Sequence, residues 1–420
     1  MTLKFKWETE FKETEIGEIP KDWDVRQVKE LVDKRKKFPI VDGPFGTQLH
    51  MNEYVSKGIP VIRVINLTYE GKFSKENLVF ITEEKFEQLK RSEVNPYDLI
   101  IAKTGATIGK LALLPPEIPK GLISSSCLKV SFDKKLANPK YYLKFFMHSI
   151  GQENIKIRAE GGSTRDTINL TPFSEIPVPY PSPEEQSRIA AVLSWFDDLI
   201  ENKKRQNEIL EKVTMAIFKS WFVDFEPFKD EEFVYNEELG KEIPKGWKIR
   251  KLKELTENIT SGRGRYIIKA KEGRYPLWGA NGILGFINEY DLEGFAILTG
   301  RVGTLGKVFL VNDKFAISDN VLTLIPKKPI YTFFMYLWMK TQIDFESLNV
   351  GSTQPLITKT ALGNQNVILP PQPILQCFHT LVEPLFQKII LNQKQIMVLR
   401  KIRDALLPKL VFGKLRVVEI

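Results

Sequence analysis

The chain has 420 residues, of which 43% are apolar and 27% are charged, and its formal net charge is +9. This length predicts two or three domains, each large enough for its own core. No apolar run approaches the ~18 residues of a membrane span, and the N-terminus lacks the apolar segment of a signal peptide. We therefore expect a cytoplasmic protein with no membrane partner. Two cysteines are too few for a disulfide framework or a four-cysteine zinc site, and the basic balance favours a nucleic-acid partner.

Residues 1–180 predict a first domain with a mainly β core. Short apolar segments bounded by Gly, Pro or Asp are typical of strands, and they occur at 61–67, 98–105, 110–115 and 128–132. Asn138-Pro139 is typical of a helix N-cap followed by the first helical residue. We therefore expect a mixed domain in which one helix accompanies the strands.

Residues 181–222 predict one long helix. Two prolines and an acidic first turn suit a helix N-terminus, and apolar side chains then recur at helical spacing with no Gly or Pro from 184 to 222. The middle of this helix is polar and contains Asn202 and Gln206. Its end contains Phe218, Trp221 and Phe222, which we interpret as a docking face for partner helices.

The second part of the chain repeats the order of the first. The segment EIPKDW (18–23) returns as EIPKGW (242–247), TGATIGK (104–110) as TGRVGTLGK (299–307), and GGSTRDTINLT (161–171) as VGSTQPLITKT (350–360). Landmarks in the same order predict an internal duplication, with a second domain at 223–370 that opens with an acidic linker at 223–238. The segments 32–104 and 256–299 differ in length, so we expect any difference in binding specificity to lie there.

The segment 371–420 predicts a second long helix followed by a tail. This helix is also polar in its middle, at Asn392 and Gln395, and Pro384 predicts a kink or a late start. Antiparallel pairing would place the two polar middles opposite one another and would fix the register of the helices; the alternative is an ordinary helical hairpin core. The predicted fold class is thus α+β, with two mixed, mainly β domains separated by a pair of long antiparallel coiled-coil helices.

Motifs for catalysis are weak in this sequence. GATIGK lacks the spacing of a phosphate-binding loop, and Leu111 stands where Ser or Thr would hold magnesium. Asn95-Pro96-Tyr97-Asp98 resembles an adenine-methyltransferase motif, but no Gly-rich cofactor loop precedes it. The three histidines are far apart in sequence and form no ligand cluster. The sequence therefore predicts no catalytic site and no metal site.

Side chains suited to DNA binding occur in both predicted domains. Arg and Lys recognise guanine, Asn and Gln recognise adenine, and Ser, Thr and backbone amides hold phosphates. The candidates in the first domain are Arg63, Asn66, Lys103, Thr104, Lys110, Ser163, Thr164 and Arg165, and those in the second are Arg263, Arg265, Tyr275, Trp278, Asn281, Arg301, Lys307, Asn320, Ser352, Thr353 and Gln354. Their occurrence as two sets in duplicated domains favours duplex DNA over a small ligand.

Together these segments resemble the specificity subunit of type I restriction-modification systems over essentially the whole chain. The resemblance is carried by EIPKDW and EIPKGW, PYDLIIAKTGATIGK, GGSTRDTINLT, the helix start PSPEEQSRIAAVLSWFDDLIE and the ending RDALLPKLVFGKLRV. It implies two target-recognition domains that each read one half of a bipartite double-stranded DNA target. It also implies helices that set the spacing and dock two methylation subunits, and restriction subunits that complete the complex. S-adenosylmethionine, ATP and magnesium are then expected only on the partner subunits.

Two other classes of protein are compared with this interpretation. A self-contained methyltransferase would need a cofactor site that the sequence does not offer. A coiled-coil DNA-binding adaptor or scaffold outside restriction-modification would have little need of two recognition domains that differ at 32–104 and 256–299. This class of protein remains the alternative.

Overall fold

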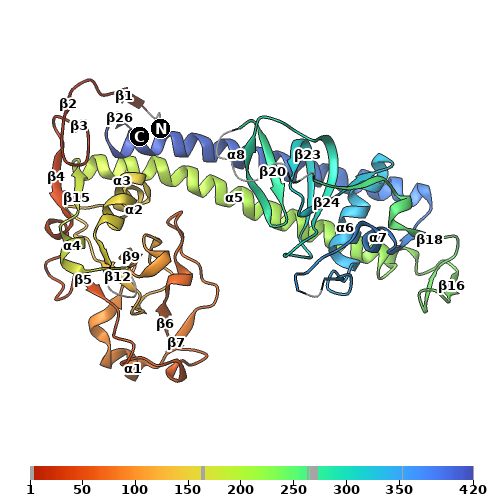
Figure 1. The fold of residues 1–420 in the computed structure, drawn as a ribbon, viewed down its shortest axis with the longest axis horizontal. Helices are drawn as coiled ribbons and strands as arrows, with labels where there is room; N and C mark the ends of the chain where they lie inside the picture. Colours follow the sequence, from red (N-terminus) through yellow and green to blue (C-terminus); the bar gives the residue numbers. More distant parts are fainter. Residues whose placement is uncertain (1–3, 162–165, 263, 265–272, 352, 420) are drawn as a thin grey trace. The chain divides into compact units, whose positions relative to one another are not determined.

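The computed structural model describes residues 4–161, 166–262, 264, 273–351 and 353–419 (Figure 1). Two compact units divide the chain: unit 1 is Met1–Ile200 with Val398–Ile420, and unit 2 is Glu201–Met397. Each unit therefore contains one mainly β segment and part of each long helix. Among the described residues, no helix has the length and apolar character needed to cross a membrane.

Unit 1 is built on two four-stranded sheets. One has the order β10-β9-β12-β5 and the other β7-β6-β11-β8, while β15-β4, β13-β14, β2-β3 and β1-β26 form two-stranded sheets. The strands are β1 (Lys4–Trp7), β2 (Phe11–Lys12), β3 (Ile19–Pro20), β4 (Asp24–Gln27), β5 (Ile40–Asp42), β6 (Ile59–Ile62), β7 (Val79–Ile81), β8 (Glu93–Val94), β9 (Leu99–Ala102), β10 (Leu111–Leu113), β11 (Gly121–Ile123), β12 (Cys127–Val130), β13 (Ala159–Gly161), β14 (Asp166–Ile168), β15 (Pro177–Tyr180) and β26 (Leu415–Glu419). The short helices are α1 (Glu83–Gln88), α2 (Pro139–Met147), α3 (Ser149–Ile157) and α4 (Leu170–Ser174).

Unit 2 contains one six-stranded sheet with the order β19-β24-β22-β23-β20-β21, and the pairs β16-β17 and β18-β25. Its strands are β16 (Phe233–Asn236), β17 (Lys241–Pro244), β18 (Lys248–Lys251), β19 (Thr256–Ser261), β20 (Tyr275–Gly279), β21 (Gly282–Ile287), β22 (Leu292–Gly300), β23 (Val308–Ile317), β24 (Val321–Pro326) and β25 (Asn366–Leu369). Its short helices are α6 (Thr332–Gln342) and α7 (Lys359–Gly363). The predicted acidic linker contains β16, which pairs with β17.

One strand of unit 2 explains why the sheets differ between the repeats. β23 pairs with β22 along most of its length and then with β20 through Ala316 and Ile317. In unit 1 the corresponding segment is two strands, β10 and β11, separated by Leu114–Lys120, which contains Pro115, Pro116 and Pro119. Proline has no N–H to donate and fixes φ, so it interrupts a strand inside a sheet. Three prolines thus divide into two sheets what unit 2 keeps as one.

The long helices are α5 (Pro183–Phe222) and α8 (Gln372–Val411). Within unit 2 Asn207 of α5 contacts Asn392 of α8, and within unit 1 Asp197 contacts Arg403. Within unit 2, Phe218 lies later in α5 than Asn207 and packs against Phe378, which lies earlier in α8 than Asn392. The pairing of the helices in this unit is therefore antiparallel, as predicted. Helix α8 begins before Pro384 and runs through it, so the expectation of a late start was wrong.

The core of each unit packs the short helices and the strands against the long helices. In unit 1, Tyr141, Tyr142, Phe145 and Phe146 of α2 are fully buried with Ile189 and Leu193 of α5. In unit 2, Phe333, Phe334 and Tyr336 of α6 are buried with Phe378 and Phe386 of α8.

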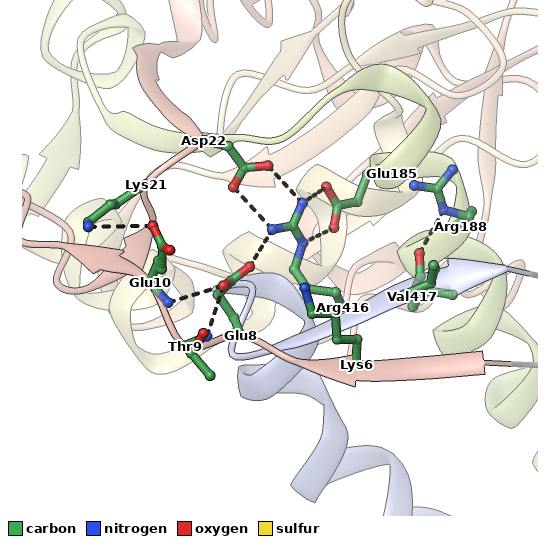
Figure 2. Close-up of a pocket in the computed structure, with 11 residues that line it drawn as sticks. Lys6, Glu8, Thr9, Glu10, Lys21, Asp22, Glu185, Arg188, Arg416 and Val417 are labelled. Atoms are coloured by element: carbon green, nitrogen blue, oxygen red, sulfur yellow. Dashed lines mark hydrogen bonds and ion pairs between the residues drawn. The ribbon is translucent and has the colours of Figure 1, made fainter.

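Arg416 on β26 joins the two ends of the chain within unit 1 (Figure 2). Its guanidinium lies 2.7 Å from Glu8 Oε2 and 3.0 Å from Asp22 Oδ2, and its Nη2 donates to Glu185 Oε2 at 2.8 Å. The backbone N–H groups of residues 10 and 9, and then Arg416, lower the pKa of Glu8 against the opposing effect of burial. Three carboxylates from separate segments contact the Arg416 guanidinium beside a cavity of about 470 Å³. We interpret this cluster as a structural contact that holds these segments together.

Candidate nucleic-acid interface

A hydrogen-bonded junction forms in unit 2 where β22 ends and β24 begins. The backbone N–H of Arg301 donates to Asn320 O at 2.8 Å, and the N–H of Ile357 donates to Arg301 O at 2.9 Å. Val302 and Leu356 form the next bridge. The backbone of Arg301 is therefore held from both sides by loops that are distant in sequence.

The same junction is present in unit 1. The N–H of Lys103 donates to Ser126 O at 2.8 Å, the N–H of Ile168 donates to Lys103 O at 2.9 Å, and Thr104 bridges Thr167. Lys103 and Arg301 are thus structurally equivalent. The loops that leave these junctions end in matching segments, Gly109-Lys110 before β10 and Gly306-Lys307 before β23, which gives the predicted duplication a structural basis.

A third strand completes each junction. In unit 1 the N–H of Ser124 donates to Ile62 O at 2.9 Å, and in unit 2 the N–H of Ser318 donates to Trp278 O at 2.9 Å. The strand end at Trp278 leads into a hairpin turn whose Asn281 Nδ2 donates to Thr304 Oγ1 at 3.0 Å. The predicted residues Trp278, Asn281, Arg301 and Asn320 are therefore brought together in unit 2.

Close backbone packing requires glycine at one matched position beside each junction. A Cβ on Gly43 would lie 2.0 Å from Ser124 O, and a Cβ on Gly262 would lie 2.2 Å from Ile317 O. Each glycine directly follows the edge strand of its sheet, β5 or β19. This equivalence between the front halves of the repeats was not predicted, although Asp42-Gly43 and Ser261-Gly262 were a signal for it.

The charge around the two equivalent cations differs. Lys103 Nζ lies 2.8 Å from Asp42 Oδ2, with side chains that are 13% and 20% exposed. In unit 2 Ser261 takes the place of Asp42, because Asp42 pairs with Leu128 and Ser261 with the equivalent Leu322. The buried Nε of Arg301 has no hydrogen-bond partner among the described residues. Unit 1 therefore holds its cation with a carboxylate, whereas the guanidinium of Arg301 has no such partner within the described part of unit 2.

Two predicted residues on the loop after β6 have positioning roles. Asn66 is fully buried, its Nδ2 donates to the carbonyls of Ser74 and Glu76 at 3.0 Å, and its Oδ1 accepts the N–H of Arg63 at 2.9 Å. The prediction that Asn66 contacts DNA is therefore corrected, since its amide has partners and no exposure. Arg63 Nη2 donates to Asn77 O at 2.6 Å, so its guanidinium also ties this loop together.

The other predicted residues lie in the loops and strands around the junctions or outside the described structure. Lys110 Nζ lies 5.8 Å from the centre of the Tyr69 ring, and Tyr275 packs against Tyr290 at the end of β20 opposite Trp278. Lys307, Thr353 and Gln354 are exposed in loops beside the unit 2 junction. The predicted residues Ser163, Thr164, Arg165, Arg263, Arg265 and Ser352 lie outside the described residues.

Comparison with known proteins places this arrangement in a family. A family model described as type I restriction modification DNA specificity domain matches residues 20–212 and 244–400. The MjaIX type I specificity subunit of Methanocaldococcus jannaschii is 38% identical, over 100% of this chain and 99% of that protein. The chain belongs to the type I restriction-modification DNA specificity family.

More distant members of the specificity family agree with this assignment. The HindI specificity subunit of Haemophilus influenzae is 20% identical over 76% of this chain and 86% of its own length. A crystal structure of the S subunit from M. genitalium, at 19% identity, covers 93% of this chain and 96% of its own with a TM-score of 0.56, so the fold is shared. The two segments matched by the family model each contain one junction, and a scaffold outside restriction-modification is not favoured.

The helices of this specificity-family chain meet through the polar side chains that were predicted to fix their register. Asn392 is fully buried, and its Nδ2 donates to Asn207 Oδ1 at 2.9 Å and to Gln206 Oε1 at 3.2 Å. Asn202 participates through Gln206 Nε2, which donates to it at 2.9 Å. Gln395 is the exception, because its buried Oε1 has no hydrogen-bond partner among the described residues.

The predicted docking face at the end of α5 was wrong. Phe218 and Phe222 are buried, and Phe222 packs against Trp247, Phe334 and Phe378 with ring centres 4.7 to 5.9 Å apart. Trp221 packs against Phe378 in the same cluster. These side chains form the core of unit 2, because helix α6 and the start of α8 cover this face of α5.

Proposed function

We propose that this chain is the DNA-recognising subunit of a type I restriction-modification complex, and that each unit reads one half of a bipartite duplex target. The observation that carries the proposal is the repeated junction, which holds a cation at the same place in both units. Because its backbone hydrogen bonds are the same in both units while its side chains differ, the repeat supports one mode of reading with two specificities.

The side chains at the unit 2 junction suit direct contact with base edges. An arginine guanidinium can donate two parallel hydrogen bonds to guanine, and asparagine or glutamine can pair with adenine in the same way. Arg301, Asn281 and Gln354 supply these groups, and the last two are exposed. In unit 1, Lys103 supplies a single ammonium that Asp42 orients. We therefore infer that unit 2 reads a guanine through Arg301.

The long helices expose a matched pair of apolar side chains in each unit. In unit 2, Ile209 and Val213 of α5 are 53% and 42% exposed, and in unit 1, Val398 and Ile402 of α8 are 55% and 42% exposed. The two pairs are separated by the same 189 positions as the helical repeat. Apolar side chains at i and i+4 form a seam that a partner helix can cover. We infer two equivalent docking sites, one for a methylation subunit on each unit.

The chemistry of the complex then belongs to the partner subunits. A methylation subunit must take the target base out of the duplex into its own pocket, and it would supply S-adenosylmethionine. Restriction subunits would supply the sites for ATP and magnesium. This chain, in the cytoplasm, would contribute recognition and the spacing of the two half-sites, with no catalytic site of its own.

Selection from a random duplex library, with this chain co-purified with its methylation subunits, tests the proposal. We expect two short motifs separated by a fixed gap of unselected bases. A single uninterrupted motif, or none, would contradict two-site reading.

The docking sites have a separate test in the stoichiometry of the complex. Ile209→Glu with Val213→Glu, or Val398→Glu with Ile402→Glu, should each reduce the bound methylation subunits from two to one in native mass spectrometry. Lys212→Gln is the matched control at an exposed polar position of α5. Two subunits retained by both double variants would exclude these apolar pairs as the docking sites.

A further inference from the structure

Unit 1 carries a basic pocket that was not predicted from the sequence. It has a volume of about 400 Å³, and its lining includes Lys36, Lys37 and Phe38 from the loop before β5 and Lys90 and Arg91 from the turn before β8. The ring of Phe38 is 37% exposed. Lys37 Nζ and Arg91 Cζ lie 5.4 Å and 5.7 Å from the centre of that ring. Two cations thus flank an exposed aromatic ring.

The lining of this pocket has more positive than negative charge, because it includes five basic side chains and one acidic side chain, Glu93. Asp98 lies 3.2 Å from Lys36 Nζ and 3.4 Å from Lys129 Nζ, and the side chains of Asp98 and Lys129 are each 5% exposed. One carboxylate therefore serves two ammonium groups, both of which also donate to Ser131 Oγ. Burying a charge without full compensation is costly, so an anion bound in the pocket would be stabilised.

The segments that form the pocket are specific to unit 1. Eight residues, 32–39, separate Leu31 from Ile40, the first residue of β5. In unit 2 the residues equivalent to Leu31 and Ile40 are Leu255 and Ile259, and only three residues, 256–258, separate them. The turn at Lys90–Ser92 and strand β8 likewise have no counterpart in the six-stranded sheet of unit 2, as far as that unit is described. The pocket therefore belongs to the front half of the repeat, where the two units differ.

The pocket is continuous with the junction through a shared carboxylate. Asp42, which holds Lys103, also lies 3.5 Å from Arg91 Nη2, and Ser92 Oγ donates to Asp42 O at 2.9 Å. Cations beside a base-reading site usually contact backbone phosphates, which position the protein on the duplex. Lys37 is exposed and forms no ion pair among the described residues.

We propose that this pocket binds a backbone phosphate of the DNA beside the half-site read by unit 1. The inference rests on the proposed function and adds to it one phosphate contact in unit 1 that the described part of unit 2 does not reproduce. Phe38 supports the stems of Lys37 and Arg91, and the phosphate lies between their charged ends.

Salt dependence of binding measures this contact. Each neutralised phosphate contributes about −0.9 to the slope of log affinity against log salt concentration. In the co-purified methylation complex on its selected duplex, Lys37→Ala should reduce the magnitude of this slope by about one. The control is Lys57→Ala, an exposed lysine at the end of β6 away from the junction, and it should leave the slope unchanged. Because Lys37 is exposed, unfolding midpoints should be equal.

A neutral methylphosphonate, placed singly along each strand, locates the phosphate. One position on the unit 1 side should weaken the wild-type complex and have no further effect on Lys37→Ala. Equal slopes for wild type and Lys37→Ala, or additive losses at every position, would overturn the inference. Failure of the proposed function would show separately, as equal affinity of the wild-type complex for the selected duplex and a scrambled duplex.

Discussion

Replacement of Arg301 by lysine should remove recognition at one base pair while leaving the charge of the interface intact. The backbone of Arg301 is fixed by hydrogen bonds of 2.8 and 2.9 Å, and its buried Nε has no hydrogen-bond partner among the described residues, so the side chain starts from a rigid backbone. A bidentate contact with guanine contributes about 1–3 kcal/mol of discrimination. Arg301→Lys should therefore lose roughly 5- to 160-fold preference at that position, while the salt slope of binding stays the same.

Competition among duplexes that differ from the selected target by single base pairs measures this loss. Only one position, within the half-site of unit 2, should become tolerant of substitution. The contrasting variant is Lys307→Ala, at an exposed lysine of the same loop, which should weaken all duplexes equally and reduce the salt slope by about one. Unchanged preference at every position in Arg301→Lys, or loss of preference in both half-sites, would refute the reading of a guanine by Arg301.

Three further predictions concern the helices. Asp197→Asn should destabilise unit 1 by about 3–5 kcal/mol, because Lys144, whose side chain is 6% exposed, loses its carboxylate. Burial alone would raise the pKa of Asp197, but Lys144 and Arg403 outweigh burial and lower this pKa. The stabilisation by Asp197 is therefore full above the unfolded pKa of about 3.9 and is lost as pH falls through the lower folded value. Urea unfolding should accordingly show that the stability of the variant approaches that of wild type in acid. Asn392→Ala should cost about 2 kcal/mol for two lost hydrogen bonds, whereas Asn392→Leu should recover most of this loss in the same assay, and a large loss in Asn392→Leu would contradict a register role. Insertion of one helical turn at 203–206 should lengthen the gap in the selected target, and an unchanged gap would show that the helices do not set it.

Features that depend on local sequence were predictable. The two long helices follow from the apolar period and the absence of Gly and Pro, and the duplication follows from ordered landmarks such as EIPKDW and EIPKGW. The pairing of Gln206 with Asn392 was also predictable, because a polar side chain in the apolar face of a paired helix is best accommodated opposite a polar side chain of the other helix. The comparisons with known proteins confirmed the predicted fold class and the family resemblance.

The availability of individual side chains was decided only by the tertiary structure. Asn66 has the chemistry of an adenine reader, but carbonyls eight and ten residues away occupy its amide. Phe218 and Phe222 have the composition of a docking face, but helices from elsewhere in the chain cover them. Lys103 and Arg301 are both cations at the end of a strand, yet a carboxylate 61 residues from Lys103 holds only the first. Period and composition report what one segment can do alone, whereas exposure and charge depend on which distant segments pack beside it.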